Sequence, residues 1–230
     1  MTRRSNAAPR ARRSRLATPY PPAFYDRATA DVARDLLGAV LECRADGVVT
    51  RGRIVEVEAY LGAHDAACHA AVGLTPRNRH LHGPPGIAYV YRIYGLHWCV
   101  NAVTREEGHG SAVLLRALAP LEGIAAMRQR RGDVPDRELA NGPGKLCQAL
   151  GISGAHDGVR LDRGPLRLRP GLPVPDGLVL VTPRIGITQA AEWPLRFCVA
   201  GDPHVSRTPG QLPRLTLDEA AAWLRGHGIR

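Results

Sequence analysis

The segment RIVEVEAY, residues 53–60, places two carboxyl groups and a phenol at alternate positions. On a β-strand, Glu56, Glu58 and Tyr60 would share one face with Ile54, because side chains alternate with a period of two. Two acids in an otherwise apolar strand are costly if they are buried and unpaired. The pattern therefore leaves two interpretations open. One is a solvated face on an edge hairpin. The other is an acid that serves as a general base or a metal ligand beside a tyrosine.

Aromatic side chains are concentrated in YVYRIYGLHWCVN, residues 89–101, although Phe, Trp and Tyr make up only 5% of the chain. The first part reads as a strand that directs Tyr89 and Tyr91 to one face, and Tyr94-Gly95 reads as a hairpin turn. A hairpin tip buries little of an aromatic ring, so Tyr94 is a candidate wedge for a stack of bases. Packing in the core explains Tyr89 more simply, whereas Tyr91 could lie inside a pocket.

Two cationic side chains occupy unusual positions. NGPGKL places backbone N–H groups and Lys145 at an expected helix start, which suits a phosphate, although the spacing of a Walker A loop is absent. Arg116 interrupts the apolar run AVLLRAL. A buried arginine requires an anionic partner, and a structural ion pair with Glu56 or Glu58 would satisfy this requirement without any catalytic role.

The elements that must position these residues form one mixed α/β (α+β) domain with hairpins. Strands 39–44 and 48–61 should be joined by the hairpin signal Asp46-Gly47. The connection 62–86, rich in Gly, Pro, Ala and His, is typical of a functional loop. Helices are expected at 26–38, 120–132, 141–151 (with Asn141 as N-cap) and 215–226, and further strands at 111–118, 178–188 and 195–201.

The net charge of +10 has an uneven distribution, because the first fifteen residues hold six arginines and no acid. We expect residues 1–18 to form a disordered basic tail and residues 19–230 to form the folded domain. A polyanion is the natural partner of such a chain.

Cysteine and histidine usage indicates neither disulfides nor a metal site. The five cysteines include no CxxC pair, and the nine histidines show no HExxH or HxH spacing. We therefore expect reduced thiols in a cytoplasm and no structural metal. No apolar stretch of about 20 residues is present, so no membrane partner is expected.

Several blocks, in this order, resemble the alkyladenine DNA glycosylase family, the 3-methyladenine DNA glycosylases of the mammalian methylpurine type. The resemblance runs from about Leu36 to Arg207. The matching blocks are EVEAYLG, TPRNR, YVYRIYG followed by CVN, VLLRAL, PLEGIAAMRQRR, GPGKLCQALGI, TPRIGI and PLRFCVAGDPHVSR. The resemblance implies a single domain with a curved, largely antiparallel sheet, flanking helices and a β-hairpin that projects into the DNA minor groove.

The resemblance also implies an activity. The partner would be double-stranded DNA containing damaged purines, and the reaction would be hydrolysis of the N-glycosidic bond without a metal or an organic cofactor. The substrates would be alkylated purines such as 3-methyladenine and 7-methylguanine, with deaminated adenine (hypoxanthine) and ethenoadenine. We expect a monomer in a bacterial cytoplasm, associated with the nucleoid through DNA.

Catalytic and pocket roles follow residue by residue from the same resemblance. Glu58 would deprotonate the water that attacks C1′, and Arg116 would help to place that water or the flanking phosphate. Tyr60, His69 and Tyr91 would line the pocket and sandwich the extruded base, with each stack worth about 1–3 kcal/mol.

Roles in DNA recognition are implied for four more residues. Tyr94 would fill the gap left in the stack, and Asn101 would test for the exocyclic amino group that marks guanine. Arg77 and Lys145 would contact DNA.

Some positions depart from the family's pattern. His97 and Trp98 occupy places where Tyr or Phe is expected, and Gly144 stands where a serine is usual. No role is assigned to His80 or His82, which read as loop residues.

Three alternatives remain at this stage. A metal-dependent nuclease would use Glu56 and Glu58 to hold Mg²⁺ and would lose activity in EDTA. A module that binds distorted DNA without cutting it would tolerate Glu58→Gln. A formyl-transfer enzyme of similar fold is an analogy of fold alone.

Overall fold

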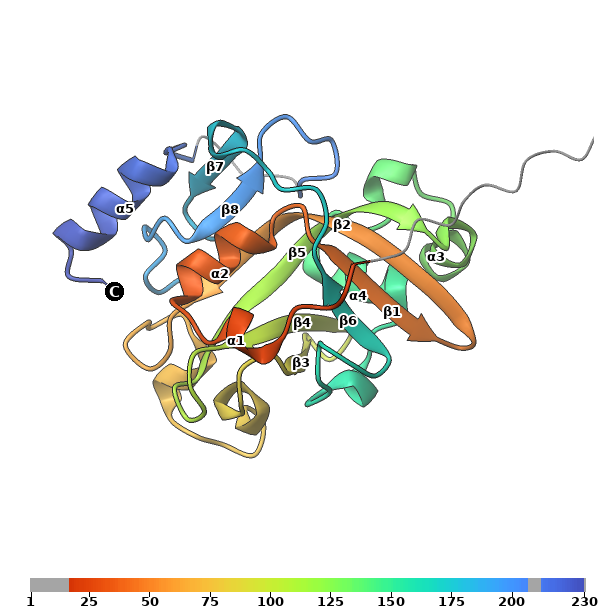
Figure 1. Ribbon diagram of the computed structural model, residues 1–230, viewed down its shortest axis with the longest axis horizontal. Coiled ribbons are helices and arrows are strands. Elements are labelled where there is room, and N and C mark those ends of the chain that lie inside the picture. Colours follow the sequence, from red (N-terminus) through yellow and green to blue (C-terminus); the bar gives the residue numbers. More distant parts are fainter. Residues whose placement is uncertain (1–16, 207–211, 230) are drawn as a thin grey trace, which may run out of the picture.

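The computed structural model describes residues 17–206 and 212–229, so the six arginines of the expected tail lie outside the described residues. The described part folds into one antiparallel sheet of eight strands with five α-helices (Figure 1). The strands are β1 (Val40–Ala45), β2 (Val48–Tyr60), β3 (Ala88–Ile93), β4 (His97–Thr104), β5 (Ser111–Glu122), β6 (Leu166–Arg169), β7 (Val179–Thr182) and β8 (Arg196–Val199). The helices are α1 (Pro22–Tyr25), α2 (Thr29–Leu36), α3 (Ile124–Arg131), α4 (Pro143–Leu150) and α5 (Leu217–Gly226).

Strand β2 lies in the interior of the sheet. The main path runs β3-β4-β5-β2-β1-β6, and β8 pairs with both β2 and β7. The first half of β2 pairs with β1, whereas Glu56 to Glu58 pair with β8, and β5 lies along the other side. The two glutamates therefore do not lie on a solvated edge hairpin, and that interpretation is wrong.

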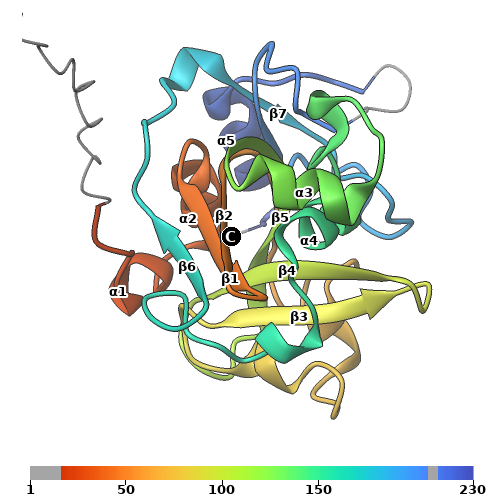
Figure 2. The same cartoon turned by 90° about the vertical axis from the view of Figure 1, so that its right-hand side faces the viewer.

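Both expected hairpins are present. Asp46 and Gly47 have φ values of 52° and 73° between β1 and β2, and Tyr94 and Gly95 have φ values of 49° and 67° between β3 and β4. Two successive left-handed residues match the twist of the flanking strands. The β3–β4 hairpin reaches past the neighbouring strands, at the right of Figure 2.

Three register shifts interrupt the pairing of β2 with β5, and two of them are bulges beside the glutamates. Ile54 pairs with Leu118 and Glu56 pairs with Ala117, so Val55 is an extra residue on β2. Val57 then pairs with Leu115, so Arg116 is an extra residue on β5. Bulges re-aim side chains and are common beside active sites.

The bulge at Val55 corrects one expectation. Ile54 does not share a face with the two glutamates, because it packs in the main core with Val57. The extra residue shifts the alternation by one position, so the period of two holds only from Glu56 onward.

Two helix starts were also predicted wrongly. Pro120 does not begin a helix, because β5 continues through it and pairs it with Gly52 beside a register shift, where a proline is tolerated. Asn141 does not cap α4. The N-cap of α4 is Gly142, and the Asn141 side chain instead accepts a hydrogen bond from Lys145.

Most of the other expected elements agree with the structure, but the strand expected at 178–188 ends at Thr182, because β7 covers only Val179–Thr182. Helices α2 and α5 lie within their predicted ranges, and α5 begins with a capping box formed by Thr216 and Glu219. Strands β7 and β8 pair with each other. All five cysteines are free and buried. No helix in the described ranges is long and apolar enough to cross a membrane.

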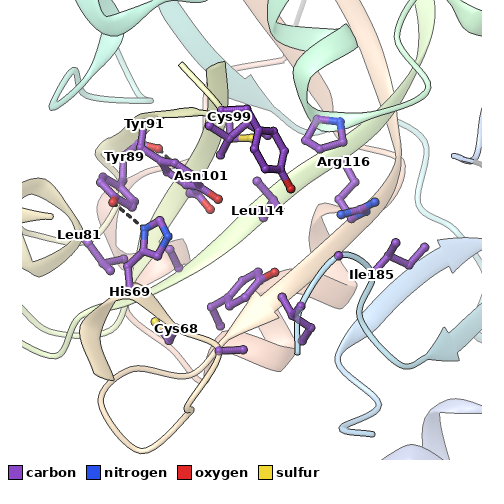
Figure 3. Close-up of a pocket in the computed structure, with 18 residues that line it drawn as sticks. Cys68, His69, Leu81, Tyr89, Tyr91, Cys99, Asn101, Leu114, Arg116 and Ile185 are labelled. Carbon is purple, nitrogen blue, oxygen red and sulfur yellow. Dashed lines mark hydrogen bonds between the residues drawn. The ribbon is translucent and has the colours of Figure 1, made fainter. Parts of the chain in front are cut away.

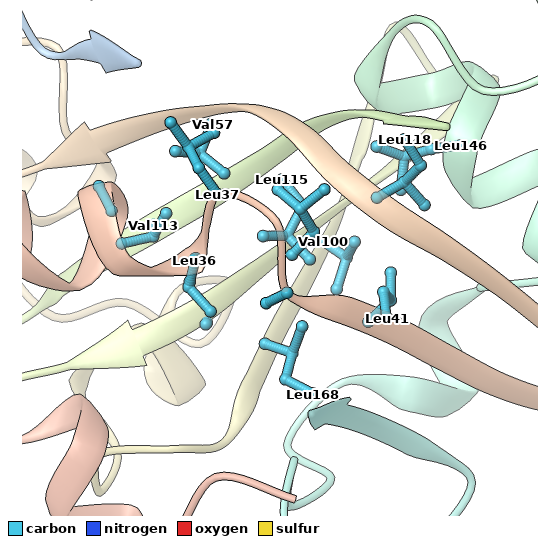
Figure 4. Packing of buried hydrophobic residues seen from close by; sticks show 14 of the residues in the cluster. Leu36, Leu37, Leu41, Val57, Val100, Val113, Leu115, Leu118, Leu146 and Leu168 are labelled. Atoms are coloured by element: carbon cyan, nitrogen blue, oxygen red, sulfur yellow. The ribbon is translucent and has the colours of Figure 1, made fainter. Parts of the chain in front are cut away.

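The main core lies on one face of the sheet, where it is covered by α2 and α4. Figure 4 shows Leu36 and Leu37 packed beside Val57 and Leu115, with Leu146 of α4 close to Leu118. Because side chains alternate along β3, β4 and β5, the neighbours of these core residues point to the opposite face. The candidate site lies on that opposite face.

Candidate active site

A cavity of about 340 Å³ opens on the sheet face opposite the main core (Figure 3). The sheet residues that line it include Tyr89, Tyr91, Cys99, Asn101, Leu114 and Arg116. The remaining walls come from Tyr60 at the end of β2, from the connection after it, from Pro143 and from residues 185–187 after β7. The pocket therefore gathers five parts of the chain that are distant in sequence.

One wall of the pocket is aromatic. Tyr89 and Tyr91 lie side by side on β3 with ring centroids 5.2 Å apart, and the ring of His69 meets Tyr91 at 4.5 Å. The Tyr89 hydroxyl is 2.8 Å from His69 Nδ1. Burial, together with the charge of Arg77, lowers the pKa of His69, which therefore favours the neutral ring. The predicted core role of Tyr89 holds as well, since this buried ring supports His69 and Tyr91 from behind.

Glu58 is fully buried and its carboxylate is held on both oxygens. Oε2 accepts hydrogen bonds from the Tyr60 hydroxyl at 3.0 Å and from Arg116 Nη1 at 3.2 Å, and Oε1 accepts the backbone N–H of Ile185 at 2.7 Å. Glu58 itself does not line the cavity, but all three of its donors do. The carboxylate therefore lies one hydrogen bond behind the pocket wall.

Arg116 links the two glutamates of β2. It donates from Nε to Glu56 at 2.8 Å and from Nη1 to Glu58, so the structural ion pair considered above exists with both acids at once. The same guanidinium lines the pocket. A structural role and a role at the site are therefore combined in one side chain.

Glu56 does not line the cavity, and three donors besides Arg116 hold it. Arg196 Nε and the Ser206 hydroxyl reach Oε1 at 2.7 and 2.8 Å, and the Ser206 N–H reaches Oε2 at 2.6 Å. Burial alone would raise the pKa of Glu56, but the charges of Arg116 and Arg196 outweigh it and lower that pKa. Glu56 is thus the charged support of Arg116.

Tyr60 forms the wall between Glu58 and the opening. Burial, reinforced by the charge of Glu58, raises the pKa of its phenol well above the ordinary value, so the hydroxyl stays a donor. The guanidinium of Arg184 lies 4.7 Å from the centre of its ring.

Two more residues singled out from the sequence, Asn101 and Tyr94, line the remaining walls. Asn101 lies on β4 with its Nδ2 donating to the Tyr89 carbonyl at 2.9 Å, and it lines the pocket. At the rim stands Tyr94, whose side chain is 87% exposed at the tip of the β3–β4 hairpin. Packing in the core therefore does not explain why residue 94 is aromatic.

Two predicted residues lie outside the pocket. Arg77 donates to the Arg92 carbonyl near the end of β3 and is exposed. Lys145 bonds to Asn141 at 2.9 Å and lines a separate cavity of about 360 Å³ that shares Pro143 with the pocket.

Two of the departures from the family's pattern, Gly144 and His97, lie next to each other. A Cβ at Gly144 would lie only 3.0 Å from the Cβ of His97, so the missing side chain makes room for this histidine. His80 and His82, expected in a loop, lie in the short 3-10 helix Arg79–His82, where His80 binds Asp157 at 2.7 Å and His82 bonds to the Gly108 carbonyl. The described residues contain no cluster of three His, Cys, Asp or Glu that could hold a metal ion.

Four residues at or behind the site were not predicted from the sequence: Asp65, Arg184, Ile185 and Arg196. Arg184 and Arg196 each lie in an apolar segment that was expected to be a strand. That signal, which singled out Arg116, could have identified them as well. Asp65 and the backbone of Ile185 carried no comparable signal, because their contacts with Arg184 and Glu58 join segments that are distant in sequence.

The site is thus an aromatic pocket with an arginine in its wall and a buried carboxylate behind that wall. Residues 23–203 match the model of the methylpurine-DNA glycosylase (MPG) family. The chain therefore belongs to the methylpurine-DNA glycosylase family, and it is a monofunctional DNA glycosylase that hydrolyses N-glycosidic bonds.

Three similar proteins each carry the name "Putative 3-methyladenine DNA glycosylase". The protein of Methanoculleus marisnigri is 54% identical over 191 residues, covering 81% of this chain and 98% of the relative. That of Rhodopseudomonas palustris strain BisB18 is 50% identical over 184 residues, covering 80% and 88%. The protein of Myxococcus xanthus is 48% identical over 192 residues, covering 82% and 94%.

Proposed function

We propose that the chain removes alkylated and deaminated purines from double-stranded DNA after turning the damaged nucleotide out of the helix. The substrates would include 3-methyladenine, 7-methylguanine, hypoxanthine and ethenoadenine, and the product would be an abasic site. The observation that carries this proposal is that the three donors to Glu58 are themselves walls of the aromatic pocket. A base in that pocket would bring its C1′ close to the carboxylate.

Stacking would hold the extruded base. Tyr60, Tyr91 and His69 line one cavity, and its volume lies in the range of small-ligand sites. An electron-poor alkylated purine stacks more strongly than a normal base on such rings, and each stack is worth about 1–3 kcal/mol. Neutral His69 suits this role, because a cationic imidazolium would repel a cationic base.

Glu58 would act as the general base. A water at the pocket wall beside Arg116 would displace one of the two direct hydrogen bonds to Glu58 Oε2 and lose a proton to the carboxylate as its oxygen bonds to C1′. The bond between C1′ and the purine nitrogen breaks, and the electron pair leaves with the base. The negative charge of the carboxylate also favours the cationic sugar that develops as this bond breaks.

Tyr94 would fill the space left in the duplex. The left-handed φ of 49° at this turn position favours Asn, Asp or Gly, so a tyrosine costs local stability there. An unfavourable and exposed aromatic residue at a projecting tip fits a wedge between base pairs.

Recognition at the rim would use polar and cationic side chains. Asn101 would face the edge of the base, where it would meet the exocyclic amino group that marks guanine. Arg77 and Lys145 would contact phosphates on either side of the pocket. The enzyme would act as a monomer in the cytoplasm, without a metal or an organic cofactor.

The test uses end-labelled duplexes that each carry one lesion, incubated in EDTA and then treated with or without alkali. We expect strand breaks only after alkali, because the product is an abasic site. Glu58→Gln should lower the rate of base release by about 100-fold or more while the duplex still binds. Glu107→Gln, at an exposed position, is the matched control.

Each alternative gives a different pattern in this assay. Breaks without alkali that disappear in EDTA would indicate a metal-dependent nuclease. Binding without any base release would indicate a recognition module. Base release by the glutamine variant at the wild-type rate would remove Glu58 from the role of base.

A further inference from the structure

A buried ion pair lies directly behind the pocket, outside the residues assigned so far. Arg184 Nη2 donates to Asp65 Oδ1 at 2.8 Å, and both side chains are fully buried. A buried pair of opposite charges adds little net stability compared with apolar residues of the same shape. Its position relative to the site therefore calls for an explanation.

Asp65 ties this pair to the end of β2. Its two oxygens accept the backbone N–H groups of Leu61 and Ala67, both at 3.1 Å. Arg184 Nη1 donates to the carbonyl of Ala59 at 3.1 Å. The pair thus clamps the residues on either side of Tyr60.

The guanidinium of Arg184 also covers the back of the pocket wall. Its central carbon lies 4.7 Å from the centre of the Tyr60 ring and 5.9 Å from that of Trp193. A planar guanidinium held in this way fixes the plane of the tyrosine ring, which also carries the hydroxyl bound to Glu58.

The next residue along the chain completes the arrangement. The Ile185 N–H donates to Glu58 Oε1 at 2.7 Å, so anchoring Arg184 also places this donor. Two of the three hydrogen bonds to the Glu58 carboxylate therefore depend on where Arg184 is held.

We infer that Arg184, held by Asp65, is a positioning residue for the reaction: it sets the Tyr60 ring and the Ile185 N–H, and through them the Glu58 carboxylate. This inference rests on the proposed function. Asp65 has a second effect, because it balances a cation that would otherwise lie behind the ring on which a positively charged alkylpurine stacks. The pair thus allows cationic and neutral bases to use the same wall.

The experiment compares Asp65→Asn, Arg184→Lys and the double variant Asp65→Asn/Arg184→Met with the wild-type protein. Single-turnover excision is measured on duplexes containing hypoxanthine, which is neutral, or 7-methylguanine, which is cationic. Duplex affinity is measured in parallel, and each variant is assayed below its own melting temperature. The matched control is Arg53→Met. Arg53 lies on β2, the strand of Tyr60, and the substitution removes its salt bridge to Asp202.

We expect Asp65→Asn to lower excision of 7-methylguanine relative to hypoxanthine by about threefold or more, because the uncompensated cation repels the cationic base. The double variant should restore the wild-type ratio of the two excision rates but slow the excision of both lesions by about tenfold or more, with duplex affinity nearly unchanged. The excision rates of Arg184→Lys should lie between those of the wild-type protein and the double variant, because an ammonium keeps the charge but not the planar contact.

Two results would overturn the inference: an unchanged lesion ratio in Asp65→Asn, or excision by the double variant within about twofold of the wild-type rate. The double variant leaves no unpaired buried charge, so it decides the matter even where Asp65→Asn fails to fold. If the wild-type protein releases neither base, the proposed function fails instead, and the two failures are distinguishable.

Discussion

The hydroxyl of Tyr60 donates a 3.0 Å hydrogen bond to Glu58 Oε2, two positions earlier on the same strand. One side chain therefore presents a ring to the pocket and a donor to the carboxylate behind it. Because both groups lie on the same face of β2, base stacking and the placement of the carboxylate are mechanically linked.

Replacing Tyr60 separates these two contributions. Tyr60→Phe keeps the ring, so the affinity for a lesion-containing duplex should stay close to the wild-type value while the excision rate changes. Tyr60→Ala should also lose about 1–3 kcal/mol of stacking. Equilibrium binding and single-turnover kinetics on the same duplex measure the two effects, and equal affinities for the two variants would contradict the stacking role.

At the hairpin tip, stability and function should oppose each other. Tyr94→Asn replaces an aromatic residue at φ 49° with one that adopts this conformation readily, so the free energy of unfolding should rise by about 1 kcal/mol or less. Lesion binding should weaken, because the wedge is lost. Denaturant unfolding and duplex affinity measure the two changes.

Leu96 provides the control for this prediction, since it is exposed on the same turn. Leu96→Asn should change duplex affinity less than Tyr94→Asn does. A larger loss at Leu96 would mean that this residue, and not the tyrosine, enters the stack.

Glu56 should make the free energy of unfolding depend on pH in the acidic range. Its pKa is lowered from 4.5, so the stability it contributes is present above that value and is lost as the pH falls through the lowered one. In Glu56→Gln, the fall in unfolding free energy between about pH 5 and pH 3 should be shallower than in the wild-type protein. At neutral pH the variant should be less stable by about 3 kcal/mol, because Arg116 and Arg196 lose a charged partner.

Urea unfolding at several pH values, compared with that of the exposed control Glu107→Gln, checks this prediction. Parallel pH profiles for Glu56→Gln and the wild-type protein would show that Glu56 is not the group that titrates.

Lys145 allows a direct test of the DNA interface, because it is the only lysine in the chain. Its side chain is 40% exposed, so an amine-reactive acetylating reagent should modify it in the free protein. A bound lesion duplex should protect it, and protection should weaken at high salt as phosphate contacts are lost. Peptide mass spectrometry reads out the modification, and equal acetylation with and without DNA would place Lys145 outside the interface.

Local sequence signals predicted much of the fold. Asp46-Gly47 and Tyr94-Gly95 were predicted as turns, because each signal is contained within two neighbouring residues. The aromatic face of β3 followed from alternation alone. The family resemblance then supplied the expected roles, which remain proposals until they are tested.

What the sequence did not predict depends on partners that are distant along the chain. The bulge at Val55 and the extension of β5 through Pro120 follow from the pairing of β2 with β5, which no local pattern encodes. The contact of Asp65 with Arg184, 119 residues away, could not be read from a local pattern. Local patterns therefore identified the side chains with chemical potential, whereas tertiary contacts decided how they are supported.

The paired bulges at Val55 and Arg116 have a consequence for how this protein can vary. Deleting Val55, or inserting one residue between it and Glu58, would shift the alternation of side chains along β2. Alkyl groups would then take positions that carboxylates occupy now, and the carboxylates would move to the other face of the sheet. Compensation would require a matching change in length at Arg116 on the partner strand. We therefore expect the spacing of these two segments to tolerate neither insertions nor deletions, whereas the outer loops can lengthen freely.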